Sequence, residues 1–408
     1  MMNYIVPDLV EEILLRLPLQ SVLKFKAVSK QWKSILESRM YAERRINVGK
    51  NNRRKILAAG DHRSKWRFQG DTEIEMFYLH FDDVATRPSL TCDGLICIPV
   101  PGWVNVFNPS TGQLLRFPSG PDPVRPRPSF CPGPEFWWIN FPGDWAMGFG
   151  RHKVSGSYKV VRMFFYTNQF DILDVNIGEW RKLRRPPPFA VESKRKSACV
   201  NGSIYWLQVS GQMFAVLGLD LHTEEFRKIP PPRLGSWSDQ LVNLDDRLAF
   251  VKTRLKPYPY RRIEICILDA QEKTWTKTYN IFLRSTDLFP QKPQALWFRA
   301  LTHSSNQGHL FFHDNCKRLF KYCPETDEVR LIQRGISVLS PFVENLLLFR
   351  RRPEATTSES TSEYQPKPSV HVPSSSVFNT FKIPNMFVTT ALVSLVIFRY
   401  FCVSSRSG

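Results

Sequence analysis

One unit recurs along the middle of the chain: an apolar strand, a polar turn, a second strand and often a proline. Its five copies span 106–118, 172–186, 219–230, 267–279 and 320–332. Asn108, Asp174, Asp220, Asp269 and Glu325 mark the copies, at intervals of 66, 46, 49 and 56 residues. An irregular period near about fifty, with about four strands per repeat, is typical of a ring of small sheets. The pattern predicts a mostly antiparallel β-propeller-like domain over residues 90–349.

Hairpin signals alternate with these units. Asn201-Gly202 and Asp93-Gly94 each stand between two apolar runs, and such pairs favour two-residue hairpin turns because both residues tolerate positive φ. Looser versions of the signal occur at 243–250 and 306–312. The 31 Pro and 30 Phe also suit a turn-rich, aromatic-packed β architecture better than a helical bundle.

Residues 1–46 have helical periodicity instead. Pro7 stands where a first helical turn tolerates proline, and Pro18 ends the segment because the residue before proline is pushed out of the helical region. Ser21 is the expected N-cap of a second helix running to about Glu37. The apolar stripes comprise Leu9, Val10, Ile13, Leu14 and Leu17, then Val22, Leu23, Phe25, Val28, Trp32, Ile35 and Leu36. A module this small cannot cover both stripes itself, so they are expected to meet a partner or the rest of the chain.

These residues resemble an F-box. The opening proline, the Leu17-Pro18 pair and the segment from Val28 to Trp32 match that motif at the family's spacing, although Val6 stands where leucine is usual. Asn108-Pro109-Ser110-Thr111-Gly112 and the stretch 150–163 resemble the F-box-associated domain of plant F-box proteins. An ordinary kelch array is not indicated, because the sequence has no Gly-Gly pair.

The resemblance implies a substrate-recognition adaptor of an SCF-type (cullin-RING) ubiquitin ligase. Such a protein binds the ligase's adaptor subunit, and through it a cullin, while its β domain recruits a protein for ubiquitination. The leading adaptor contacts implied by position are Pro7, Leu9, Ile13, Leu14, Leu17 and Pro18. Leu23, Val28 and Trp32 would pack the helices against that partner or lie wholly inside the module.

Signals for catalysis are missing from the sequence. It contains no Gly-x-Ser-x-Gly elbow, no phosphate-binding loop and no His-Glu-x-x-His. His309, His313, Cys316 and Cys323 lie close in sequence, but their spacing fits no common closed zinc site. We therefore expect a non-catalytic protein that carries no metal and no cofactor.

The stretch 118–145 is rich in proline, arginine and aromatic residues. Arginine and aromatic side chains are favoured at binding hot spots, and loops on rigid scaffolds often recognise ligands. The candidate substrate-binding residues are Arg125, Arg127, Trp137, Trp138 and Trp145. Two other interpretations stay open: that these rings fill gaps between sheets, and that they stack on single-stranded nucleic acid.

Charge and cysteine usage bear on partners and compartment. The net charge is +19, of which residues 1–55 carry +7, so the excess is spread along the chain. A solvated basic surface accounts for such spreading more readily than nucleic-acid binding does. The eight Cys include no Cys-x-x-Cys pair and the start lacks a signal peptide, which favours an intracellular location in cytoplasm or nucleus. The main alternative function is an interaction scaffold or membrane-linked protein without ligase recruitment, and the second is a nucleic-acid-binding protein.

The expected organisation has five parts. An F-box module (1–46) is followed by a basic linker with irregular strands (47–89), the β domain (90–349), a flexible Ser/Thr/Pro linker (350–385) and a candidate transmembrane or tail-anchor segment (386–403). The 18 residues of that last segment suffice for a short span of a hydrocarbon core about 30 Å thick if Arg399 snorkels. A helix packed on the β domain, or a dispensable tail, are the alternatives.

Overall fold

The computed structural model describes residues 6–51, 54–59, 68, 70–79, 89–100, 103–119, 145–192, 195–210, 213–232, 236, 238–255, 260–269, 271, 274–284, 296–304 and 307–349. The segments predicted at 350–385 and 386–403 lie outside these ranges, as do Arg125, Arg127, Trp137 and Trp138. Among the helices in the described ranges, none has both the length and the apolar character needed to cross a bilayer.

Four helices open the chain: α1 (Pro7–Arg16), α2 (Leu19–Phe25), α3 (Lys30–Leu36) and α4 (Arg39–Asn51). The predicted second helix is therefore two helices, and the break is stabilised by Ser29, whose hydroxyl accepts a hydrogen bond from the Trp32 N–H at 3.1 Å. The N-cap prediction for Ser21 is wrong: α2 begins at Leu19, directly after Pro18, and Ser21 lies inside it.

The boundary expected at residue 46 falls inside α4, which continues to Asn51. The polar stretch expected to be a linker is thus largely helical. Its sequence signal is weak because α4 buries only a narrow stripe, including Tyr41 and Ile46, and most of its other residues are charged or polar.

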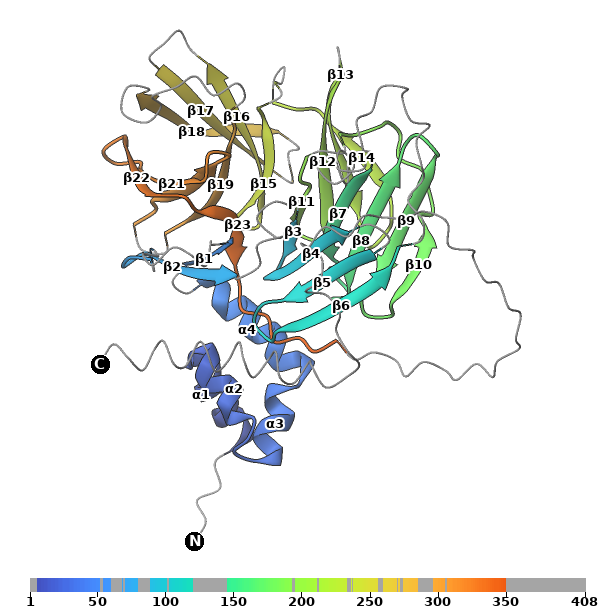
Figure 1. Cartoon of the computed structure of the whole chain (residues 1–408), viewed down its shortest axis with the longest axis vertical. Coiled ribbons are helices and arrows are strands. Elements are labelled where there is room, and N and C mark those ends of the chain that lie inside the picture. The colour runs from blue at the N-terminus through green and yellow to red at the C-terminus, as the bar shows by residue number, and fades with distance from the viewer. Residues whose placement is uncertain are drawn as a thin grey trace, which may run out of the picture. The chain divides into compact units, whose positions relative to one another are not determined.

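Five four-stranded antiparallel sheets follow (Figure 1). Blade 1 contains β3 (Leu90–Cys92), β4 (Leu95–Val100), β5 (Trp103–Asn108) and β6 (Gln113–Pro118); blade 2 contains β7 (Ala146–Arg151), β8 (Tyr158–Phe164), β9 (Gln169–Asp174) and β10 (Glu179–Lys182). Blade 3 contains β11 (Ala198–Val200), β12 (Ser203–Ser210), β13 (Met213–Asp220) and β14 (Phe226–Ile229). Blade 4 contains β15 (Gln240–Leu244), β16 (Arg247–Leu255), β17 (Tyr260–Leu268) and β18 (Trp275–Arg284); blade 5 contains β19 (Phe298–His303), β20 (Leu310–Asp314), β21 (Arg318–Cys323) and β22 (Glu328–Arg334).

The five repeat units predicted from the sequence are confirmed as the third and fourth strands of these blades. The predicted Asx-Gly hairpins join the first strand to the second. At Asp93-Gly94 and Asn201-Gly202 both turn residues have positive φ, between 45° and 79°. First strands of neighbouring blades lie side by side, so they form the inner ring of a β-propeller.

A sixth sheet closes the ring with strands from both ends of the domain. β1 (Arg54–Ala59) pairs antiparallel with β23 (Ser337–Phe342) and parallel with β2 (Ile74–Leu79), as Figure 1 shows. Part of the region expected to be a linker with irregular strands, 47–89, therefore belongs to blade 6. Pairing an early strand with the last one covers an edge that would otherwise stay open.

Apolar side chains fill the spaces between blades. Between blades 4 and 5, the rings of Phe312 and Phe320 stack with centroids 5.1 Å apart, and Phe298 packs against both. Such layers hold the inner strands in fixed register, and thereby position the turns at the strand ends.

Candidate functional site

The helical module, which we define as α1–α4, has an interior of its own. Leu14, Val22, Leu36 and Tyr41 are buried in it. The Tyr41 hydroxyl donates a hydrogen bond to the Leu14 carbonyl at 3.0 Å. Leu14, expected among the leading partner contacts, is therefore covered by its own chain in this conformation. Leu17, Leu23 and Trp32 are partly buried against the same interior.

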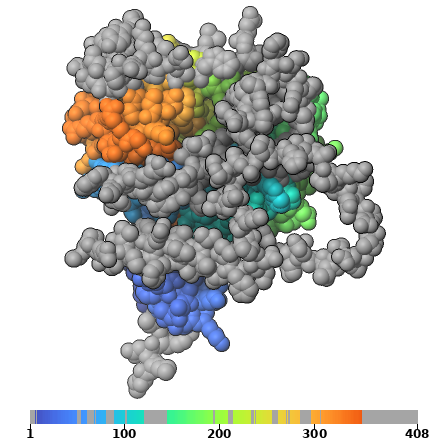
Figure 2. All heavy atoms as spheres, in the orientation of Figure 1, coloured from blue at the N-terminus to red at the C-terminus, as the bar shows by residue number. Residues whose placement is uncertain are grey.

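One side of α1 remains uncovered. Val6, Leu9 and Ile13, at helical spacing, are 57%, 56% and 47% exposed, and we call them the α1 ridge. Val28, between α2 and α3, is 58% exposed, and Pro18 is exposed as well. Pro7 is the first residue of α1. The surface of these helices is the blue region of Figure 2. Exposed large apolar side chains on a small module indicate a protein contact.

α4 ties the helical module to the propeller. The buried Arg45 guanidinium donates to the carbonyls of Leu14 and Leu17 at the end of α1, and also pairs with the Glu344 carboxylate. Lys55 of β1 contacts the same carboxylate at 2.6 Å. Burial by itself would raise the pKa of Glu344, but Lys55 and Arg45 outweigh burial and lower that pKa. One carboxylate thus joins a helix, a blade 6 strand and the segment after β23.

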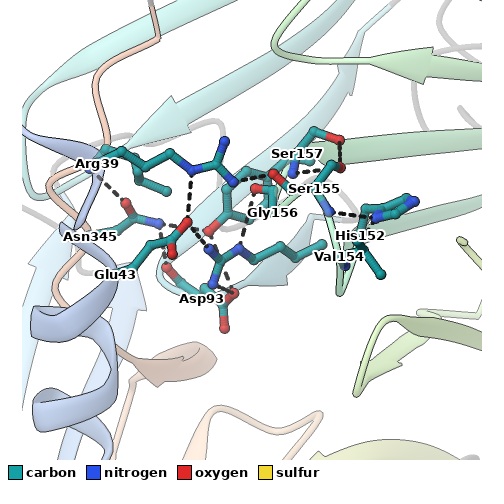
Figure 3. A network of polar contacts seen from close by, with 12 residues as sticks. Arg39, Glu43, Asp93, His152, Val154, Ser155, Gly156, Ser157 and Asn345 are labelled. Atoms are coloured by element: carbon teal, nitrogen blue, oxygen red, sulfur yellow. Dashed lines mark hydrogen bonds and ion pairs between the residues drawn. The ribbon is translucent and has the colours of Figure 1, made fainter.

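A second network links α4 to the inner hairpin turns (Figure 3). Glu43 accepts from Arg39 at 2.8 Å and from Arg151 at 2.9 Å, and Arg39 also donates to the Ser155 carbonyl. The Asn345 side-chain amide donates to the Asp93 carbonyl at 2.9 Å. The residues come from α4, from two blades and from the segment that follows β23.

These groups surround a cavity of 680 Å³. Its walls are the inner hairpin turns of several blades, including Asp93-Gly94, Asn201-Gly202 and Asp245-Asp246, together with part of α4. Gly94, at φ +79°, has a packing role here, because a Cβ would lie 1.8 Å from the Val343 carbonyl oxygen. Sequence reasoning identified these turns but not their convergence, since that depends on the ring.

Two thiols meet in the wall of the cavity. The sulfur atoms of Cys92 in blade 1 and Cys199 in blade 3 lie 3.6 Å apart, without a disulfide. Gly150 of blade 2 leaves room for Cys199, since a Cβ at Gly150 would lie 2.9 Å from that sulfur. Close approach of the inner strands therefore depends on small residues between them.

The other predicted site residues are placed as follows. Trp145 is 2% exposed and stacks on Phe164 with centroids 4.9 Å apart, while the Arg162 guanidinium lies 5.2 Å from the Trp145 ring centroid. This agrees with the interpretation that such rings fill gaps within the propeller. His309 contacts Glu73 at 2.8 Å, and the His313 ring packs against Trp297. Within the described ranges, no three His, Cys, Asp or Glu residues are grouped as metal ligands would be.

Comparison with known proteins agrees with this architecture. Residues 5–41 match the family model of the F-box domain, and residues 64–317 match that of the F-box associated beta propeller domain. The chain is 47% identical over 367 residues to the F-box/LRR-repeat protein At2g43260 of Arabidopsis thaliana, covering 86% of this chain and 84% of the relative. It is 43% identical over 419 residues to the F-box protein At2g43440 of the same plant, covering 98% and 96%.

Among solved structures, TolB from Acinetobacter baumannii aligns with a TM-score of 0.34 at 11% identity, over 59% of this chain and 53% of that one. A likeness so low supports no argument about function. The two family models and the curated plant relatives are sufficient by themselves: the chain belongs to the plant F-box proteins that carry an F-box-associated β-propeller domain.

Proposed function

We propose that this protein is a non-catalytic substrate-recognition adaptor of an SCF-type ubiquitin ligase. The helical module binds the ligase's adaptor subunit, which connects it to a cullin. The propeller holds a target protein, and the ubiquitin chemistry belongs to the other subunits. Holding a target lysine near the charged conjugating enzyme raises its effective concentration, which is the whole of the catalytic contribution expected from this chain.

The α1 ridge is the observation that supports this proposal most directly. Its three side chains are exposed, whereas other apolar side chains of the same helices fill the buried interior of the module. Burying a Val, Leu or Ile side chain fully contributes about 1.5–3 kcal/mol. A partner that covers the ridge would gain that free energy, so the ridge is where the adaptor subunit is expected to bind.

The contacts of α4 bear on how the propeller is oriented relative to the helical module. A target can be presented to a distant enzyme only if the two binding parts do not rotate freely. The buried Arg45 forms a charge network with the partly buried Glu344 and Lys55, between the module and blade 6. The network would hold the propeller in one orientation relative to the bound ligase.

Co-purification of the adaptor subunit tests the proposal. The full chain carrying Ile13→Asp is expected to lose the adaptor almost entirely, because a charge would be buried in an apolar contact. Leu9→Asp is expected to act in the same way. Val154→Asp, at an exposed apolar residue in the β7–β8 turn, is the matched control and should retain full recovery. Wild-type recovery of the adaptor by both ridge variants would refute this docking face.

A further inference from the structure

Positive charges gather at the end of the inner strands that lies opposite the hairpin turns. Arg195 and Lys196 precede β11 of blade 3, and Arg299 is the second residue of β19 of blade 5. Arg195 donates to the Asp239 carbonyl, just before β15. Arg299 donates to the Gln240 side-chain oxygen at 2.9 Å and to a main-chain carbonyl of β15 at 3.1 Å. Cations from two blades therefore flank the start of the strand between them.

His313 lies next to Arg299. The two residues are partners in the β19–β20 register, and the His313 ring packs edge-on against Trp297 with centroids 5.8 Å apart. Its Nδ1 lies 3.2 Å from the Asp314 carbonyl oxygen. This imidazole is buried, and together with Trp297 it forms a rigid side to the group of cations.

The nearby carboxylates of Glu192 and Asp239 already have other partners. Glu192 pairs with Arg195, and the buried Asp239 accepts from the Ser236 N–H at 2.7 Å and hydroxyl at 3.0 Å. Arg299 binds only neutral oxygens among the described residues. Lys196 is partly buried, and within the described ranges its amine forms no hydrogen bond and no ion pair.

The pKa values of three basic groups at this end are lowered. Burial, together with the charge of Arg299, lowers the pKa of Lys196 to about 7. Burial and Arg195 lower the pKa of Arg299 to about 10. Burial, with Arg299 and Lys196, lowers the pKa of His313 to about 3. Burial is the main cause of all three shifts and the neighbouring cations add to it, so an anion placed there would favour the charged forms of Lys196 and Arg299.

We propose that Lys196 and Arg299 form an oxyanion site that binds the phosphate or carboxylate of a side chain in an acidic peptide segment of the recruited protein. The identity of the carrier rests on the proposed function, whereas the anion site itself does not. Arginine offers a planar pair of donors and lysine a point charge, a combination suited to a tetrahedral or planar oxyanion. His313 is the register partner of Arg299, and Arg195 precedes Lys196 in the sequence; neither is assigned a direct contact with the anion.

Calorimetric titration of the full chain with inorganic phosphate, at constant ionic strength, tests the anion site. Lys196→Met should weaken phosphate binding by about tenfold or more, because a charge-assisted hydrogen bond is removed. Arg299→Gln should act likewise. Lys153→Met, at an exposed lysine that pairs with Asp220 near the hairpin turns, should leave the affinity unchanged. Equal phosphate affinity in wild type and Lys196→Met, or no phosphate binding at all, would overturn the site.

A second titration identifies the carrier. The probes are one short peptide bearing phosphoserine, its glutamate analogue and its serine analogue. Binding of the phosphoserine or glutamate peptide, reduced by Lys196→Met and absent with serine, supports the peptide assignment and distinguishes phosphate from carboxylate. Binding of inorganic phosphate without any peptide overturns the assignment. Lys196→Met should still co-purify the adaptor subunit, so failure here is distinguishable from failure of the proposed ligase role.

Discussion

The two ends of the inner strands differ in how completely their charges are paired. At the hairpin-turn end Arg39 and Arg151 both pair with Glu43, and nearby Lys55 pairs with Glu344. At the other end Lys196 and Arg299 have no carboxylate partner among the described residues. Internally paired charges fix one part of a chain to another, whereas charges left unneutralised are suited to a ligand from outside. The difference separates a structural end of the propeller from a recognition end.

The largest effect is expected where the paired end is most buried. Glu344→Gln leaves Arg45 and Lys55 without their shared anion, and removing one partner of a buried pair costs about 3 kcal/mol or more. Chemical denaturation of the full chain measures the loss. Glu328→Gln, in an exposed pair with Arg330, is the control and should change stability little. A loss as small as that of the control would show that the network does not hold the helices to the propeller.

The Glu344 carboxylate also predicts how the stability of the protein changes at acidic pH. The pKa of Glu344 is lowered in the folded state, so its contribution is present above the unfolded value of about 4.3 and is lost as the pH falls through the folded value. The difference in unfolding free energy between wild type and Glu344→Gln should therefore shrink below about pH 4.

A smaller loss is expected from Gly94→Ala. A Cβ there meets the Val343 carbonyl, and the residue's φ of +79° adds backbone strain, so we expect a loss of about 2 kcal/mol. Gly308→Ala separates the two causes, because Gly308 has φ +66° but nothing within 4 Å of its Cβ position. In thermal unfolding, the Tm of Gly94→Ala should be clearly lower than the Tm of Gly308→Ala.

Lys196→Met is expected to change stability in the opposite direction, that is, to raise it. Replacing a partly buried charge that has no partner by an apolar group is neutral or stabilising, so Lys196→Met should stabilise the free protein by about 1 kcal/mol at pH 6. Because the pKa of Lys196 falls to about 7 on folding, the unfolded chain binds more protons between about pH 7 and pH 10. Wild-type stability should accordingly rise toward that of the variant across this range. A variant that is destabilised at every pH would contradict the absence of a partner.

The smallest effect is expected for Arg39→Ala, because the Arg39 side chain is largely exposed where it contacts Glu43. Exposed pairs contribute less than about 1 kcal/mol. Measured stability should fall by no more than that, and less at high salt. Arg151→Ala, in the same network but more buried, should cost more.

How much of the fold the sequence predicted varied from element to element. The Asx-Gly turns and the strand pairs were predictable because they depend on residues adjacent in sequence, and their φ angles agree with the predicted turns. The end of α4 and the first residues of strand β1 fall in the stretch that was predicted to be a linker. These segments are stabilised by contacts with residues near 340. Contacts between residues so far apart in the chain produce no pattern in the local sequence.

The candidate sites divide in the same way. The apolar pattern of α1 indicated a partner-binding module, but only the folded helices show that Leu14 is inside while Leu9 and Ile13 are outside. Lys196 and Arg299 are about a hundred residues apart and match no motif. The sequence by itself determined the order of a helical module and a β domain built of repeats, because hydrophobic period and turn chemistry are local properties. Only the tertiary structure decided which charges are paired, because ring closure places residues from opposite ends of the domain, and from separate blades, in one electrostatic environment.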